Sequence, residues 1–151
     1  SGLNLATIYR PLNNIFLNGI MEKIRLNHIC KKQIKKGKSG TRELLQLFKN
    51  GYSIALMIDQ RVSEGIKSKL FNRSALTTTI PAQLVKKYSV DVVPVYIERK
   101  NGIYFKMQIY KPIFFDDNKS LEEITDDLNK ILEEMILKNP DQWIWSHDRW
   151  K

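Results

Sequence analysis

Apolar side chains recur along the chain with two spacings, one typical of helices and one typical of strands. The helical spacing predicts helices at residues 12–26, 41–49, 81–88 and 121–138. Short apolar runs and an alternating segment predict strands at residues 5–9, 52–59, 92–98 and 103–110. The runs at 52–59 and 92–98 suit strands buried on both faces, whereas 103–110 suits a strand with one buried face. This order of elements is typical of an α/β fold with a mostly buried sheet.

Polar residues mark the ends of several of these elements. Ser120 begins a Ser-x-x-Glu capping box before the last helix, and Asn139-Pro140 ends that helix. Asn50-Gly51 closes the second helix, and Pro81 fits the first turn of the third. Asn101-Gly102 is a favourable hairpin turn between the last two strands.

Two segments have no steady period. Residues 30–40 are basic and contain glycine, and we expect a solvated loop there. Residues 61–79 are too long for an ordinary connection, so we expect a loop that is either functional or disordered.

Composition limits the classes of protein that remain. A chain of 151 residues with 42% apolar content can bury one core, so one domain is expected. No apolar run reaches about 18 residues, and the first residues lack the pattern of a secretory signal. A single cysteine excludes an internal disulfide framework, and two histidines argue against a zinc site.

The net charge of +9 is unevenly distributed. Residues 1–73 hold 14 Lys and Arg against 4 Asp and Glu, whereas residues 74–151 hold 11 against 12. One surface should therefore be strongly electropositive and attract phosphates of nucleic acid, of anionic lipid or an acidic protein. Charge alone does not choose among these partners.

Candidate chemistry lies at the ends of two predicted strands. Walker, dinucleotide-binding and serine-elbow motifs are absent, and His28 and Cys30 are spaced too closely to face each other on a helix. Arg10 follows the first strand and Asp59-Gln60 follows the second, where ligands gather in open α/β sheets. These groups could bind a phosphate. Alternatively, Asp59 caps a turn and Arg10 is a surface residue.

A series of motifs resembles the late acyltransferases of lipid A biosynthesis, the lauroyl/myristoyl enzymes of lipopolysaccharide assembly. In order, the motifs are Tyr9-Arg10-Pro11 with Asn13, residues 48–60 ending in Asp-Gln, residues 77–82, residues 92–99 and the ending NPDQWIWSHDRWK. The ending is the most specific, although Asp141 and Asp148 depart from the family pattern. The resemblance spans essentially all 151 residues and implies a glycerolphosphate-acyltransferase-like α/β fold, a mixed sheet flanked by helices.

The resemblance also implies a reaction and its participants. Family members transfer an acyl chain from acyl carrier protein to a lipid A precursor at the cytoplasmic face of the inner membrane of Gram-negative bacteria, without a metal or cofactor. Their His-x4-Asp/Glu motif supplies the general base, yet neither His28 nor His147 has an acidic residue five positions on. We therefore expect residues 1–151 to be the C-terminal part of a single acyltransferase domain, inactive alone, or a divergent relative that lacks the dyad.

The same resemblance assigns roles to particular residues. Arg10 corresponds to an arginine that binds phosphate or acceptor, Asp59 and Gln60 lie near the acceptor site, and Thr79 and Pro81 shape the acyl pocket. Asn72 replaces a family glycine at a turn, where asparagine tolerates the left-handed conformation.

All three tryptophans fall within the last nine residues. If that tail is extended, Trp143, Trp145, His147 and Arg149 share one face. Trp143 and Trp145 could pack on the sheet, whereas Trp150 and Lys151 are candidates for contact with an anionic membrane surface. An alternative to the enzyme is a basic module that binds nucleic acid through phosphates and aromatic stacking.

Overall fold

The computed structural model describes residues 2–151 and has a mixed α/β fold with small parallel and antiparallel sheets and four α-helices among these residues. The chain divides into two compact units, Ser1–Leu56 and Met57–Lys151. No helix among residues 2–151 combines the length and apolar character needed to cross a bilayer. The expectation of an α/β class is confirmed.

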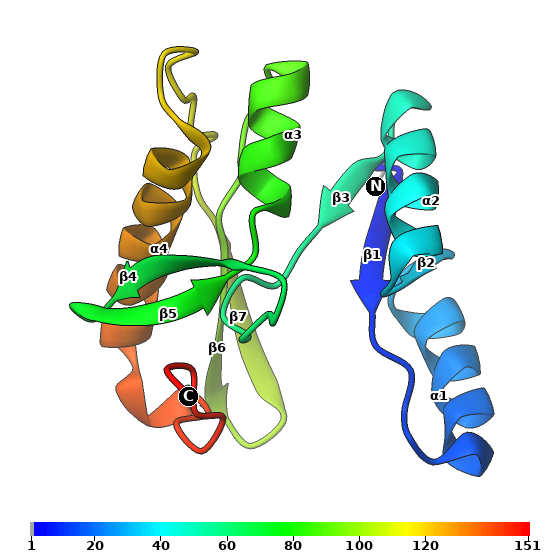
Figure 1. The fold of residues 1–151 in the computed structure, drawn as a ribbon. Helices are drawn as coiled ribbons and strands as arrows, with labels where there is room; N and C mark the ends of the chain where they lie inside the picture. The colour runs from blue at the N-terminus through cyan, green and yellow to red at the C-terminus, as the bar shows by residue number, and fades with distance from the viewer. Residues whose placement is uncertain (1) are drawn as a thin grey trace. The chain divides into compact units, whose positions relative to one another are not determined.

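The first unit is a parallel three-stranded sheet with two helical crossovers (Figure 1). Its strands are β1 (Leu5–Tyr9), β2 (Lys32–Lys35) and β3 (Ser53–Ala55), in the order β2-β1-β3. Helices α1 (Ile15–His28) and α2 (Lys38–Lys49) connect them. Ala6, Ile34 and Leu44 are almost completely buried and form the centre of this unit.

Four sequence expectations change in the first unit. Helix α2 begins at Lys38 rather than at residue 41. The basic segment expected to be a loop contains β2, because Ile34 is fully buried and pairs beside Ile8 of β1. Helix α1 begins at Ile15 rather than at residue 12, since the Asn14 side chain accepts hydrogen bonds from two backbone N–H groups of its first turn. Strand β3 has only three residues and ends at Ala55, short of the predicted 52–59.

The second unit begins with a β-hairpin where a long loop was expected. Strands β4 (Ile66–Leu70) and β5 (Arg73–Thr77) pair in antiparallel register. The turn between them places Phe71 at φ 50° and Asn72 at φ 61°, so both residues adopt the left-handed conformation. The tolerance expected for Asn72 is confirmed.

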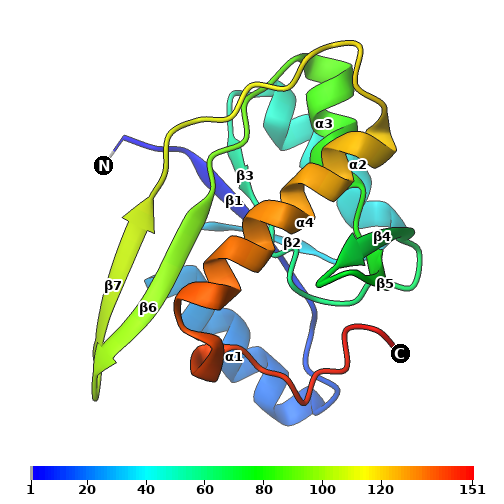
Figure 2. The same ribbon diagram turned by 90° about the vertical axis from the view of Figure 1, so that its left-hand side faces the viewer.

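Helix α4 (Leu121–Lys138) is the central packing element of the second unit. It packs against α3 (Ile80–Tyr88) on one side and the β4–β5 hairpin on the other, as Figures 1 and 2 show. Leu132 and Ile136 meet the hairpin, whereas Ile124 and Leu128 meet α3. The predicted capping box at Ser120 is present, and Pro81 lies in the first turn of α3 as expected.

Strands β6 (Val95–Asn101) and β7 (Tyr104–Ile109) form the hairpin predicted at Asn101-Gly102. The burial predicted for this hairpin is wrong, because its apolar residues are exposed. These residues include Val95, Ile97, Ile103, Phe105, Met107 and Ile109. The opposite face meets the end of α4, where the Asn139 amide donates to Glu98 and to the hydroxyl of Tyr96. Across residues 2–151 the strands lie in three small sheets.

Candidate functional site

The C-terminal tail is folded into turns and is not extended. After the short 3-10 helix η1 (Pro140–Gln142), the tail turns back so that its three indoles meet. The ring centroids of Trp143 lie 4.6 Å from Trp145 and 5.9 Å from Trp150, both in edge-on geometry. The tail was expected to place Trp143 and Trp145 on one face if it were extended. Instead, its tryptophans form a cluster.

Arg149 anchors this tail although it carries a charge, because its side chain is fully buried. Its Nη1 donates to the carbonyl oxygen of Leu76, and its Nη2 donates to Thr77 Oγ1 at 3.0 Å and to the Ile58 carbonyl oxygen at 3.3 Å. The Trp150 indole adds a bond to the Leu70 carbonyl oxygen at 3.0 Å. These contacts fix the tail on the β4–β5 hairpin.

A buried chain of polar side chains continues from this anchor into α4. Asn129 Nδ2 donates to Thr77 Oγ1 at 3.0 Å and to Ser68 Oγ at 2.7 Å. The Ser68 hydroxyl in turn donates to Asp126 at 2.5 Å. Side chains held by several such bonds keep a fixed geometry, so the tail, the hairpin and α4 form one rigid support.

Asp59 lies beside this support and is half buried. Its Oδ1 is inaccessible to solvent and has no hydrogen-bond partner among the described residues. Burial lowers the pKa of the Arg149 guanidinium, and the negative charge of nearby Asp59 opposes that change. A buried carboxylate oxygen without a donor is costly, so hydrogen bonds among the described residues do not account for the position of this carboxylate.

Asp59 also lines a hollow of about 350 Å³. The other lining residues are Gln60, Trp143, Ile144 and His147. The His147 ring is oriented by the backbone N–H of Arg61, which donates to Nε2 at 3.3 Å. The hollow therefore joins the segment after β3 to the C-terminal tail, 83 or more residues later in the chain.

The lining is chemically selective. It offers a carboxylate, an amide and an imidazole for hydrogen bonding, together with one indole and one aliphatic side chain. Among the described residues, neither lysine nor arginine lines the hollow, and the nearby Arg149 already uses its terminal nitrogens within the protein. Such a surface suits a neutral, hydroxyl-bearing ligand better than a bare phosphate. Among residues 2–151, no three His, Cys, Asp or Glu side chains are grouped to hold a metal ion.

The structure brings together only part of the predicted site. Asp59 and Gln60 line the hollow, whereas Arg10 is exposed after β1 and belongs to the first unit. The approach of Arg10 to Asp59 stays a prediction. Trp143 and His147 were not assigned to the site from the sequence, because nothing local connects them to a segment so distant along the chain.

The remaining predicted residues lie elsewhere in the second unit. Thr79 precedes α3 and its hydroxyl accepts a hydrogen bond from Gln83 at 3.0 Å, while Pro81 is buried. Trp150 is half buried against the core, and Lys151 is exposed with its carbonyl oxygen bound by Arg61. Their roles in acyl binding and membrane contact stay predictions.

Comparison with models of protein families matches residues 2–151 to the family described as bacterial lipid A biosynthesis acyltransferase. Comparison with curated individual proteins gives no match. The family match covers nearly the whole chain, including β1, the hollow and the tail.

Proposed function

Since the chain belongs to the bacterial lipid A biosynthesis acyltransferase family, we propose that it serves acyl transfer from acyl carrier protein to a lipid A precursor. In this proposal, residues 1–151 form the C-terminal part of one acyltransferase domain with a glycerolphosphate-acyltransferase-like sheet. The reaction takes place at the cytoplasmic face of the inner membrane. The family match supports the reaction class, and the hollow beside Asp59 supports a part in binding the acceptor.

The single observation that carries this assignment is that Asp59 lines a hollow whose described lining residues include no lysine or arginine. Saccharide hydroxyls are donors that a carboxylate accepts strongly, and the face of an indole packs well on sugar C–H groups. We therefore assign the hollow to the saccharide of the acceptor. His147 and Gln60 provide further polar contacts at its wall.

The phosphate of the acceptor requires a different group. Arg10 is exposed after β1 in the unit that carries most of the positive charge, and its planar guanidinium can bind phosphate with two parallel hydrogen bonds. Thr79 and Pro81 at the start of α3 contribute to the wall of the acyl pocket in the same proposal.

The chain by itself should not catalyse transfer. Neither histidine is followed by an acidic residue at the spacing of the His-x4-Asp/Glu motif, so the general base for the acceptor hydroxyl is not supplied in that form. Residues 1–151 incubated with acyl-loaded carrier protein and a lipid A precursor should give no acylated product. Turnover by this chain would show that another group acts as the base.

Saccharide binding tests the assignment of the hollow directly. The probe is the deacylated, dephosphorylated saccharide of a lipid A precursor, and the signal is tryptophan fluorescence, because Trp143 lines the hollow. Asp59→Asn should weaken binding by about tenfold or more, since a hydrogen bond to a charged group contributes about 1.5–3 kcal/mol. Asp148→Asn is the matched control, because that exposed carboxylate lies on the same tail outside the lining.

The outcomes separate the alternatives. Equal binding by wild type and Asp59→Asn would exclude Asp59 as a sugar ligand. Inorganic phosphate that competes for the hollow would show that the assignment to the saccharide is wrong.

A further inference from the structure

The polar side of helix α1 faces strand β1 within the first unit. Glu22 accepts a hydrogen bond from the Tyr9 hydroxyl at 2.9 Å and one from Asn18 Nδ2 at 2.8 Å. The Arg25 guanidinium lies 5.0 Å from the centre of the Tyr9 ring. Burial and the bond to Glu22 raise the pKa of Tyr9, so Tyr9 stays protonated as the donor. Polar groups thus join α1 to β1.

The apolar side of α1 faces away from these contacts. Ile15 is 85% exposed, Phe16 90% and Ile20 57%, and no residue of the helix is buried. Leu17 and Ile24 are exposed as well, and with Phe16 and Ile20 they fall within about 100° of one another around a helix with 3.6 residues per turn. A surface helix of a globular protein ordinarily packs its apolar stripe on the core. Here the arrangement is reversed, which indicates an apolar partner outside the unit.

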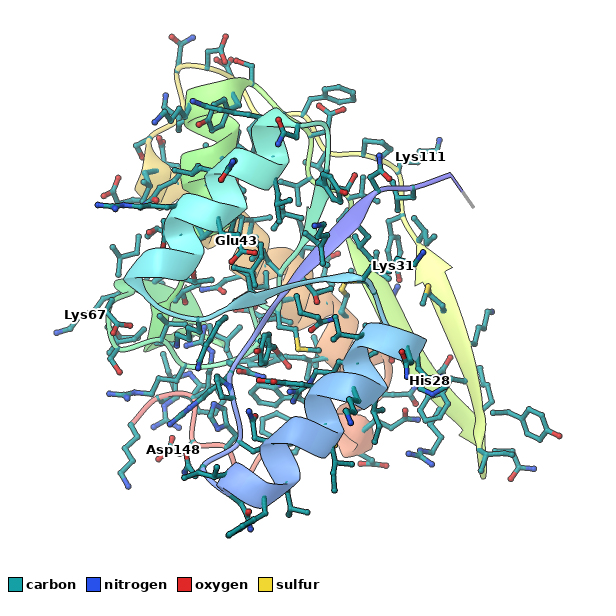
Figure 3. The ribbon with its side chains drawn as sticks, turned by 90° about the vertical axis from the view of Figure 1, so that its right-hand side faces the viewer. His28, Lys31, Glu43, Lys67, Lys111 and Asp148 are labelled. Carbon is teal, nitrogen blue, oxygen red and sulfur yellow. The ribbon has the colours of Figure 1, made fainter. Side chains whose placement is uncertain are left out.

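The unit that carries this stripe is strongly basic. The first unit, Ser1–Leu56, holds 10 Lys and Arg against 2 Asp and Glu, a net charge of +8. Lys23 lies on α1 itself, and Figure 3 shows His28 at its C-terminal end with Lys31 just after it. Lys32, Lys35 and Lys36 are exposed as well. Two copies of so basic a unit would repel each other, whereas an anionic surface would attract each copy.

We propose that α1 is an interfacial helix that lies on an anionic lipid bilayer. Phe16, Ile20 and Ile24 enter the boundary between headgroups and acyl chains, and the lysines of the first unit meet the lipid phosphates. The proposed function enters this inference at one point: it identifies the membrane as the inner membrane. It places membrane contact on α1, whereas Trp150 of the tail is packed on the core.

Vesicle binding by the full chain tests this inference. Wild-type protein should co-sediment with vesicles of equal parts phosphatidylethanolamine and phosphatidylglycerol, and added salt should release it. Vesicles of phosphatidylcholine alone should bind it more weakly. The double variant Phe16→Gln/Ile20→Gln should lose about tenfold or more in affinity, because interfacial binding scales with the apolar area inserted.

Two controls isolate the helix. Thermal unfolding followed by circular dichroism should be unchanged in the double variant, because neither side chain is buried in the folded chain. Ile103→Gln removes an apolar residue that is 83% exposed at the β6–β7 turn and should leave vesicle binding unchanged.

The inference is overturned if the double variant binds vesicles as wild type does, or if Ile103→Gln weakens binding equally. It is also overturned if wild type is a dimer in solution that the double variant dissociates, since α1 would then contact a second copy. Failure of saccharide binding with intact vesicle binding would refute the proposed function alone. The reverse result would refute the interfacial helix alone.

Discussion

Arg149 carries a charge without a salt bridge at its terminal nitrogens, since all their bonds go to neutral oxygen atoms. Two backbone carbonyl groups and the Thr77 hydroxyl accept these bonds, and the Asp59 charge lies near enough to favour the ionised guanidinium. A charge held in this way is strongly dependent on its surroundings, because removing one partner leaves the other groups buried and unpaired. Arg149 therefore both stabilises the second unit and holds the tail residues that line the hollow.

Arg149→Met should lower the free energy of unfolding of the second unit by about 1–3 kcal/mol, because it leaves buried oxygen atoms without their hydrogen-bond donor. Urea unfolding followed by tryptophan fluorescence measures this, since all three tryptophans lie in that unit. Arg73→Met is the matched control. The Arg73 Cζ lies over the Trp150 ring, 5.1 Å from its centroid, and loss of this contact should cost about 1 kcal/mol or less. Similar effects of the two substitutions would contradict a special role for the buried guanidinium.

Among the elements, the β4–β5 hairpin depends on a close backbone approach at Gly65. A Cβ atom at this position would lie 2.3 Å from the Thr77 carbonyl oxygen, and backbone cannot move aside as a flexible side chain can. Gly65→Ala should therefore destabilise the second unit by about 1–3 kcal/mol, measured by urea unfolding. Gly19→Ala in α1 meets open space and should instead stabilise its unit by about 0.5–1 kcal/mol. A neutral Gly65→Ala would mean that the hairpin can shift at its base.

The start of α4 gives a stability contribution that depends on pH. The backbone N–H and hydroxyl of Ser120 bond with Glu123 and lower the pKa of that carboxyl below its usual range. A lowered folded-state pKa means that the contribution is present above the unfolded pKa of about 4.3 and is lost as pH falls through the folded value. Glu123→Ala should thus be less stable than wild type at neutral pH, and the difference should shrink in acid. Urea midpoints at several pH values test this, and a gap that persists in acid would contradict it.

The helices were predictable from the sequence because their signals are local. The capping box at Ser120 and the proline at position 81 act within one turn, and both elements begin where these residues place them. The β4–β5 hairpin was missed because small or polar residues such as Ser68, Ala75 and Thr77 fill its buried positions, which hides the alternation. Burial of β6 and β7 was predicted wrongly because an apolar pattern shows which face is apolar without showing what covers it.

Only the part of the site formed by Asp59 and Gln60 was predictable, because only that part has a local signal in the sequence. Asp59 and Gln60 follow an apolar run, a position where polar residues attract attention in any α/β sequence. Trp143 and His147 come close to Asp59 and Gln60 only because the buried Arg149 holds the folded tail in place. From its neighbours in the sequence alone, Arg149 would be predicted to lie on the surface. Long-range convergence of this kind leaves no periodic signal.

At the scale of the whole molecule, most of the positive charge and all of the tryptophans lie in different parts of the chain. Residues 1–56 carry a net charge of +8, whereas the three tryptophans lie in residues 57–151, whose net charge is +1. Proteins that bind single strands through stacking interleave basic and aromatic side chains along one groove. Here the tryptophans pack on one another: Trp143 lies edge-on to Trp145 and Trp150, and Trp145 is stacked with Trp150. Trp143 and Trp150 also pack on the core. This distribution favours an anionic surface over nucleic acid as the partner of the basic unit.

A short single-stranded oligonucleotide should therefore bind only through charge. We expect weak binding that disappears as salt is raised toward physiological strength, with no quenching of tryptophan fluorescence, because no base stacks on the tail. The lipid A saccharide should change the same fluorescence signal at the same salt concentration, since Trp143 lines its hollow. Oligonucleotide quenching that survives physiological salt and is lost in Trp145→Ala, whose indole is 48% exposed, would instead identify the tail as a nucleic-acid surface.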